Sequence, residues 1–419
     1  LKQLNAKTRW IDELITLLIN KEYISIKDEE MINFIENKIN ELNSEEQLFI
    51  NKLGEFYLIK NKLDIVKLKI ESIIDLIDRI PNNITLDNEN LLNTIRTEYE
   101  ELSDEDKMLI ININTLEEAE IEYNYIKELE GLKNGNALDC ISDTLTSDSY
   151  DELVKNTKDY IITWNSSNEK LVYFENGYIR VSKVYQTHKK QTVTLSATVK
   201  FKDGTTVTSS KEVIVNPVKY KELSNTPVAT YYQSTALSSY TSYSERYKQE
   251  KTLFSDKAKE VLDIIYFAFG HIDSNGNITL SDPGIVSELN KLKENDVRVL
   301  VSIAGISTEG SNIFAILTSD ETKLNNFVNN IMNLIEKYNF DGVDVDWEST
   351  GDANVLSKGL NNLLKSLREE MNKRQDKDGS DYLLTVAIPA RTTDITPDKF
   401  DFETTNFIEK TPFRVYINN

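Results

Sequence analysis

The sequence has only one cysteine, Cys140, and two histidines, His188 and His271, among its 419 residues. A single thiol excludes an internal disulfide and a zinc site built from cysteines. Two histidines that fall in different predicted domains argue against a two-histidine metal site and against a histidine-based catalytic triad. We therefore expect no metal and no cofactor, and we interpret both histidines as ordinary core or surface residues.

Basic residues are outnumbered by acidic ones, and long apolar runs are missing. Lysine and arginine number 48 against 69 aspartates and glutamates, a net charge of −21, which argues against nucleic acid and anionic membranes as partners. No run of about 18 apolar residues occurs, so we expect no membrane span. The chain begins at Leu1 without a signal peptide. We interpret it as a segment of a longer secreted or cell-surface protein, which we expect to be a monomer.

Proline and glycine are nearly absent from the N-terminal part, which is rich in leucine, isoleucine and acidic residues. Sequence blocks repeat there at a spacing of about 60 residues. Ile24–Asp28 and Leu42–Glu46 recur as Ile84–Asn88 and Leu102–Asp106. The blocks resemble helical repeats of large bacterial surface proteins. A spacer role is favoured over a partner-binding stalk, because amphipathic periodicity alone implies only a core. We predict two helical units here: residues 1–69 and 70–131.

A period of two replaces the helical pattern after the linker Gly131–Ala137. Apolar residues alternate with polar ones through Val193–Phe201 and again through Val207–Val215. The turn residues Asp203 and Gly204 lie between these two runs. This arrangement predicts a β-hairpin.

The hairpin sequence and the segment Thr163–Ser167 resemble bacterial immunoglobulin-like domains. The resemblance implies a small β-sandwich over residues 138–218. We expect Trp164 to be buried in the core of a rigid spacer. Carbohydrate binding through Trp164 and Tyr173 is the alternative.

From Val218 onward, apolar strands alternate with amphipathic helices. Strands are expected in five places: residues 227–232, 261–270, 297–303, 343–348 and 382–389. Helices are expected among them: residues 285–292, 324–338 and 355–371. This rhythm is typical of a parallel α/β barrel of the TIM type. The fold class we predict is therefore multidomain: helical repeats, an immunoglobulin-like β-sandwich, and a partial TIM barrel over residues 219–419.

The fourth of these strands carries an unusual row of acids. Val343, Val345 and Trp347 alternate with Asp344, Asp346 and Glu348, so one face is apolar and the other acidic. Successive carboxyl groups lie about 6.6 Å apart along such a strand. An exposed strand with a solvated acidic face is the plain alternative. A valine-rich strand that follows a helix is usually a buried parallel strand, and barrels carry their chemistry at the C-terminal ends of such strands.

The segment Asp341-Gly342-Val-Asp344-Val-Asp346-Trp-Glu348 resembles the signature of family 18 glycoside hydrolases, the chitinase family. Tyr266–Phe269 resembles the family's second strand. Ser302–Gly305 resembles its third strand, with Ala304 where the family has glycine, and Leu384–Ala390 its fifth. The resemblance covers residues 228–390. The Met-x-Tyr-Asp motif of the family's sixth strand is absent, so we expect a barrel truncated after about five of its eight strands.

This resemblance implies a role for each acid. Glu348 would donate a proton to the leaving oxygen, and Asp346 would orient the substrate's acetamido group and stabilise an oxazolinium intermediate. Asp344 would lie deeper and share a hydrogen bond with Asp346. The acetamido oxygen of the substrate would attack, so the configuration at the anomeric carbon is retained. Asp341 precedes the alternation, and we interpret it as structural.

Aromatic faces stack on sugar rings, so Tyr232, Phe269 and Trp347 are the candidate substrate-binding residues; a core position is the alternative for Tyr232 and Phe269. The favoured function is retaining hydrolysis of β-1,4-linked N-acetylglucosamine polymers such as chitin. Two alternatives stay open: an endo-β-N-acetylglucosaminidase acting on glycoprotein glycans, and a non-catalytic chitin-binding or surface adhesion protein. Trp347 before the glutamate favours the chitinase branch, and the presence of Glu348 argues against a lectin.

Overall fold

The computed structural model describes residues 2–223, 227–233, 254–304, 308–347, 353–389 and 414–416. The chain divides into two compact units, Leu1–Asn134 and Gly135–Asn419. Among the described residues, no helix combines the length and the apolar character that crossing a membrane requires.

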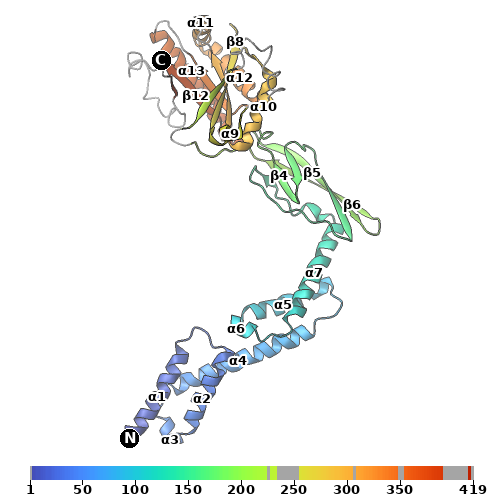
Figure 1. Ribbon diagram of the computed structural model, residues 1–419, viewed down its shortest axis with the longest axis vertical. Helices are drawn as coiled ribbons and strands as arrows, with labels where there is room; N and C mark the ends of the chain where they lie inside the picture. The colour runs from blue at the N-terminus through green and yellow to red at the C-terminus, as the bar shows by residue number, and fades with distance from the viewer. Residues whose placement is uncertain are drawn as a thin grey trace. The chain divides into compact units, whose positions relative to one another are not determined.

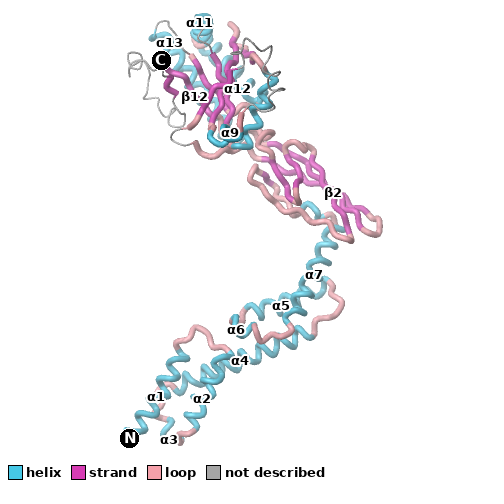
Figure 2. Tube along the Cα trace, viewed as in Figure 1, coloured by secondary structure: helices cyan, strands magenta, loops and turns pink. Residues whose placement is uncertain are grey.

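The first unit is helical, as the sequence predicts (Figures 1 and 2). Its elements are α1 (Lys2–Ile19), η1 (Ile26–Asp28), α2 (Glu29–Asn40), α3 (Ser44–Gln47), α4 (Leu53–Asp78), η2 (Leu86–Asn88), α5 (Glu89–Glu100), α6 (Asp104–Lys107) and α7 (Ile113–Lys133). The sequence repeat reappears as two equivalent series, η1–α2–α3 and η2–α5–α6. Asn43 caps α3 by accepting hydrogen bonds from the backbone N–H groups of Glu45 and Glu46, and Ser103 caps α6.

The long helix α4 is shared by two apolar cores. Its first turns bury Phe56, Ile59 and Leu63 against α1 and α2, and its last turns bury Ile73 and Ile77 in the second cluster. These residues recur every three or four positions, so they lie along one stripe of the helix. One continuous helix therefore joins the two repeats.

The second unit begins with η3 (Asn136–Leu138) and a set of six strands, of which β5 and β6 are the longest. These are β1 (Thr144–Leu145), β2 (Tyr160–Ser166), β3 (Val172–Glu175), β4 (Tyr178–Val181), β5 (Gln191–Phe201) and β6 (Thr206–Val215). One sheet has the order β1-β6-β5-β2, and β3 and β4 form a separate pair. The expected hairpin is β5–β6, in antiparallel register, with Gly204 at φ +88° in its turn. The immunoglobulin-like topology stays a prediction.

Trp164 of β2 is half-buried, and its ring centroid lies 5.8 Å from that of Phe174 on β3. This contact joins the two small sheets. It favours the packing role over a sugar contact for Trp164.

The rest of the second unit is built on a parallel sheet. Its strands are β7 (Ala229–Gln233), β8 (Ile264–Ile272), β10 (Arg298–Ala304), β11 (Gly342–Asp346), β12 (Leu383–Pro389) and β13 (Arg414–Tyr416). Their order is β13-β12-β11-β10-β8-β7, and β9 (Ile278–Leu280) pairs antiparallel with β8. The expectation of five strands was one too few, because β13 also pairs in parallel with β12. Three residues are too short to show an alternating pattern.

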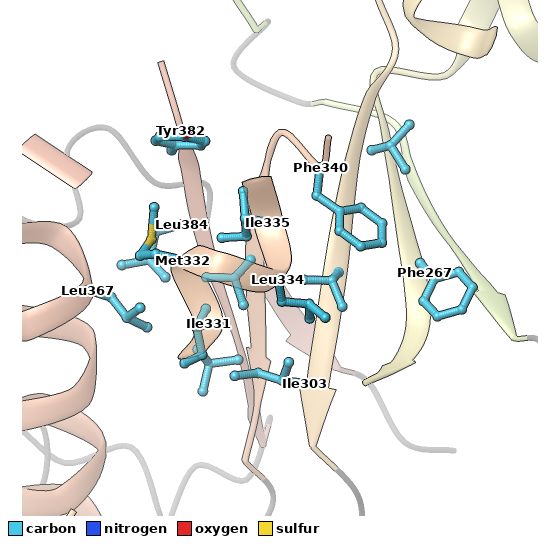
Figure 3. Close-up of a cluster of buried hydrophobic side chains, with 14 of the residues drawn as sticks. Phe267, Ile303, Ile331, Met332, Leu334, Ile335, Phe340, Leu367, Tyr382 and Leu384 are labelled. Carbon is cyan, nitrogen blue, oxygen red and sulfur yellow. The ribbon is translucent and has the colours of Figure 1, made fainter. Parts of the chain in front are cut away.

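Helices cover the outer face of this sheet. They are α9 (Asp256–Val261), α10 (Val286–Asn290), α11 (Thr308–Leu317), α12 (Glu321–Tyr338) and α13 (Ala353–Asp378), with the short turns η4 (Pro283–Ile285) and η5 (Lys291–Asn295). Figure 3 shows Ile331 and Ile335 of α12 packed toward the strands, with Leu367 of α13 beside them. A separate small cluster, which includes Tyr266, Leu300 and Leu383, fills the inner face of the sheet.

Candidate active site

Asp344 of β11 is the centre of the inner face of the parallel sheet. Its side chain is fully buried. It accepts hydrogen bonds from the hydroxyls of Tyr231 on β7 (2.8 Å), Ser302 on β10 (2.8 Å) and Thr385 on β12 (2.6 Å). Removing a carboxylate from water is costly, and three hydroxyl donors offset that cost.

The strand register explains why these hydroxyls converge. Ser302 pairs with Asp344, and Asp344 pairs with Thr385, so the three side chains form one row across β10, β11 and β12. In a parallel sheet, residues in one row point to the same face. Tyr231 lies on a more distant strand, and its long side chain spans the inner face to reach the same carboxylate.

Asp346 follows two residues later on the same face of β11 and is 5% exposed. It lies nearer the C-terminal end of the strand, which is where parallel barrels place their reacting groups. Glu348 lies outside the described residues. Its assignment as proton donor therefore stays a prediction.

The candidate sugar-contacting aromatics lie in different surroundings. Tyr232 and Trp347 are each 5% exposed and belong to the core between the sheet and its helices. Trp347 stacks on Phe314 of α11 with ring centroids 4.9 Å apart. These contacts favour a packing role, and a substrate contact by Tyr232 or Trp347 stays a prediction.

Phe269 is better placed, because it is half-buried and its ring centroid lies 6.2 Å from that of Tyr231. The pairing of β8 with β10 shifts at this point: Ser302 pairs with Ala268, whereas Ile303 pairs with Gly270. Phe269 is therefore the extra residue of a β-bulge, and a bulge turns a side chain out of the regular alternation.

Asp341 holds the other end of β11. Its carboxylate is fully buried and accepts hydrogen bonds from Lys293 Nζ (2.9 Å), Tyr220 Oη (2.7 Å), His188 Nε2 (3.0 Å) and the backbone N–H of Val299 (2.7 Å). Burial by itself raises the pKa of Asp341. The ammonium of Lys293 and the hydrogen bonds from His188 and Tyr220 lower the pKa by more. Together they hold the pKa well below the usual range of an aspartate.

Gly342 follows directly, and its place allows β11 and β12 to approach each other. A Cβ atom at this position would lie 1.8 Å from the carbonyl oxygen of Leu383. The close approach of the two backbones therefore requires a residue without a side chain.

Tyr231 and Thr385 are functional candidates that the sequence analysis did not single out. Tyr231 and Tyr232 are neighbours on one strand, so only one of them faces Asp344, and the sequence pattern does not say which one. Parallel register is set by tertiary packing, so no local signal pairs Thr385 with Asp344.

Comparisons with known proteins relate the C-terminal part of the chain to one family. The model of glycosyl hydrolases family 18 matches residues 236–408. Chitinase A1 of Niallia circulans is 31% identical over 147 residues, which is 28% of this chain and 21% of that protein. A probable endochitinase of Caenorhabditis elegans is 26% identical over 159 residues, which is 35% of this chain and 25% of that protein.

Among solved structures, a family 18 N-acetylglucosaminidase from Paenibacillus barengoltzii is similar at 22% identity and a TM-score of 0.35. That alignment covers 47% of this chain and 53% of the other. On the match to the family model, the C-terminal part of the chain carries a glycosyl hydrolase family 18 domain, and chitinases are among its relatives. The chain spans only about a fifth to a quarter of the length of the two curated relatives.

Proposed function

We propose that this protein is a retaining glycoside hydrolase that cleaves β-1,4-linked N-acetylglucosamine polymers such as chitin. The observation that carries the proposal is the row of groups around Asp344. A fully buried carboxylate is fixed by three hydroxyl donors, and Asp346 follows it on the same face of β11. The chitinase relatives of the family 18 domain support the same substrate class.

In this mechanism Glu348 protonates the glycosidic oxygen, and the bond between that oxygen and the anomeric carbon breaks. The acetamido carbonyl oxygen of the same sugar forms the new bond to the anomeric carbon, so no protein carboxylate attacks. Water then opens the oxazolinium ring, Glu348 takes up the proton of that water, and the original configuration is restored.

Asp346 would accept a hydrogen bond from the N–H of the acetamido group and offset the positive charge of the oxazolinium ring. Asp344 cannot move freely, because its three hydroxyl partners come from three other strands, β7, β10 and β12. It therefore gives Asp346 a fixed neighbour with which to share a hydrogen bond. Phe269, half-buried beside Tyr231, offers a ring face to a pyranose.

The test is hydrolysis of N-acetylglucosamine oligomers by the full-length protein, with the anomer of the fresh product followed by NMR. Release of the β-anomer supports the proposal, and release of the α-anomer contradicts retention. A glycoprotein with high-mannose glycans is the second substrate. Cleavage of that glycan alone would replace chitin by the endo-β-N-acetylglucosaminidase activity, and binding without cleavage would make the protein a lectin.

We also propose that the protein acts outside the cell or on its surface, because a polymeric substrate does not enter cells. We propose further that it is a monomer. Fractionation of the source cells and light scattering of the purified protein test these two points.

A further inference from the structure

We propose that the β-rich segment that precedes the family 18 domain positions its acidic strand, and that His188 is the positioning residue. His188 lies in the loop between β4 and β5, outside the parallel sheet. Its Nε2 lies 3.0 Å from Asp341 Oδ1, across 153 positions of sequence. The effect on catalysis rests on the function proposed above, whereas the effect on β11 does not.

Asp341 controls where β11 begins. Its backbone N–H donates to Val299 at 2.7 Å, and its backbone oxygen accepts from the N–H of Leu383 at 2.9 Å. Asp341 is thus bonded to β10 on one side and to the start of β12 on the other. It precedes Asp344 by three residues and Asp346 by five. A change at Asp341 therefore moves the carboxylates along the sheet or turns them away from it.

Two of the groups that hold the Asp341 carboxylate come from outside the parallel sheet and its helices. They are the imidazole of His188 and the hydroxyl of Tyr220, which follows β6. The third side chain, Lys293 of η5, is fully buried and also donates to the backbone oxygen of Asn339 at 2.5 Å. The carboxylate consequently joins the β-rich segment, η5 and β11.

The same β-rich segment contacts both loops that lead into the central strands. Asn339, which ends α12 before β11, donates from Nδ2 to the backbone oxygens of Val184 (3.2 Å) and Gln186 (2.9 Å). Ahead of β10, the hydroxyl of Ser182 donates to Glu294 at 2.6 Å. The segment is therefore hydrogen-bonded to the residues just before β10 and just before β11, the two strands that carry Ser302 and Asp344.

The chemistry of His188 suits a fixed donor. The side chain is 2% exposed and stacks on Tyr382 with ring centroids 4.3 Å apart. Burial lowers the pKa of His188 more than Asp341 raises it, so the ring is neutral at pH 7. A carboxylate only accepts, so Nε2 carries the proton and Nδ1 does not. A glutamine amide can supply the same N–H donor.

The experiment compares two substitutions of His188 in the full-length chain. His188→Phe keeps a ring to stack on Tyr382 but removes the donor, and His188→Gln keeps the donor. Lys189→Met is the matched control, since it removes an exposed ion pair with Glu336 at the same boundary. Two experiments are made on each variant: steady-state kinetics on an N-acetylglucosamine oligomer, which give kcat and KM, and hydrogen exchange of the β11 amides.

We expect His188→Phe to lower kcat by about tenfold or more with KM nearly unchanged, because small displacements of reacting groups are costly. We expect its β11 amides to exchange faster, and His188→Gln and Lys189→Met to resemble the wild type in both measurements. Wild-type kcat and exchange in His188→Phe would overturn the proposal. So would equal losses in all three variants, which would show a general weakening of the boundary.

If His188→Phe does not fold, Tyr220→Phe provides the second variant, because it removes only one hydroxyl donor from Asp341. It is expected to accelerate β11 exchange and to lower kcat in the same sense. If the wild type hydrolyses no oligomer, the proposed function has failed. Exchange then decides by itself: faster β11 exchange in Tyr220→Phe or His188→Phe keeps the positioning role, and unchanged exchange removes it.

Discussion

Thr385 Oγ1 donates a 2.6 Å hydrogen bond to Asp344 Oδ1 from the neighbouring strand, 41 positions further along the chain. Both side chains are fully buried. Thr385→Val keeps the shape and removes the donor, so we expect the free energy of unfolding to fall by about 1.5–3 kcal/mol. Urea unfolding measures this. Thr208→Val, which removes an exposed hydroxyl contact to Thr198, is the control and should change stability by less than about 0.5 kcal/mol.

Glu348→Gln tests the proton donor directly. General acid catalysis contributes about 10²–10⁴-fold to the rate, so kcat should fall by at least about 10²-fold. The variant should still bind the oligomer. Steady-state kinetics and calorimetric titration give the two values. Glu369→Gln, an exposed residue of α13, is expected to retain full activity. A Glu348→Gln protein that cleaves at the wild-type rate would remove Glu348 from the mechanism.

Gly342→Ala should be among the most damaging small substitutions in the protein. The new methyl group would meet the Leu383 carbonyl at 1.8 Å, so β11 and β12 must separate. We expect the free energy of unfolding to fall by more than about 3 kcal/mol, or the protein not to fold. Gly54→Ala in α4 is the matched control, because no atom lies within 4 Å of its added Cβ and alanine favours a helix. A soluble Gly342→Ala protein with wild-type melting temperature would contradict this account.

Lys293 and Asp341 form an ion pair in which both side chains are fully buried. Lys293→Met leaves the carboxylate without its cation, and we expect a cost of about 3–5 kcal/mol in unfolding free energy. The double variant Lys293→Met with Asp341→Asn removes both charges and should recover part of this loss. Additive losses in the two single variants and the double variant would show that the pair does not interact.

The neutral state of His188 also predicts a pH dependence. Its pKa is lowered in the folded protein, so the unfolded chain binds a proton first as the pH falls below about 6.5. The unfolded state then holds more protons, and stability falls with decreasing pH. Near His188 the other charged groups are Asp341, Lys293 and Asp381. His188→Gln removes the titrating group, so its unfolding free energy should change less between pH 7.5 and pH 5.5. Parallel curves for the two proteins would assign the dependence to carboxylates.

Local sequence patterns predicted helices and strands well where the secondary structure of a residue is decided by its neighbours in the sequence. The helical repeats follow from their apolar stripes, the β5–β6 hairpin from its alternation and turn, and β11 from alternating valine and aspartate. Each of these signals lies within a short window of sequence.

Relations between distant segments were not predictable in this way. The meeting of Tyr231 with Asp344 depends on strand register, and the exclusion of Tyr232 from the inner face follows from the same register. His188 was interpreted as an ordinary residue, because nothing in its neighbourhood indicates a carboxylate 153 positions away. Phe269 was selected from the sequence as a candidate aromatic, and this stays a prediction. Its orientation depends on a bulge that the sequence does not mark.

The continuous helix α4 has a mechanical consequence for the helical repeats. Its 26 residues extend over about 39 Å, with the first half buried in one core and the second half in the other. Tension applied along this helix therefore reaches both cores through one hydrogen-bonded rod. The two repeats share this helix, so we expect neither repeat to unfold under tension without affecting the other. The pair should resist extension as one stiff segment.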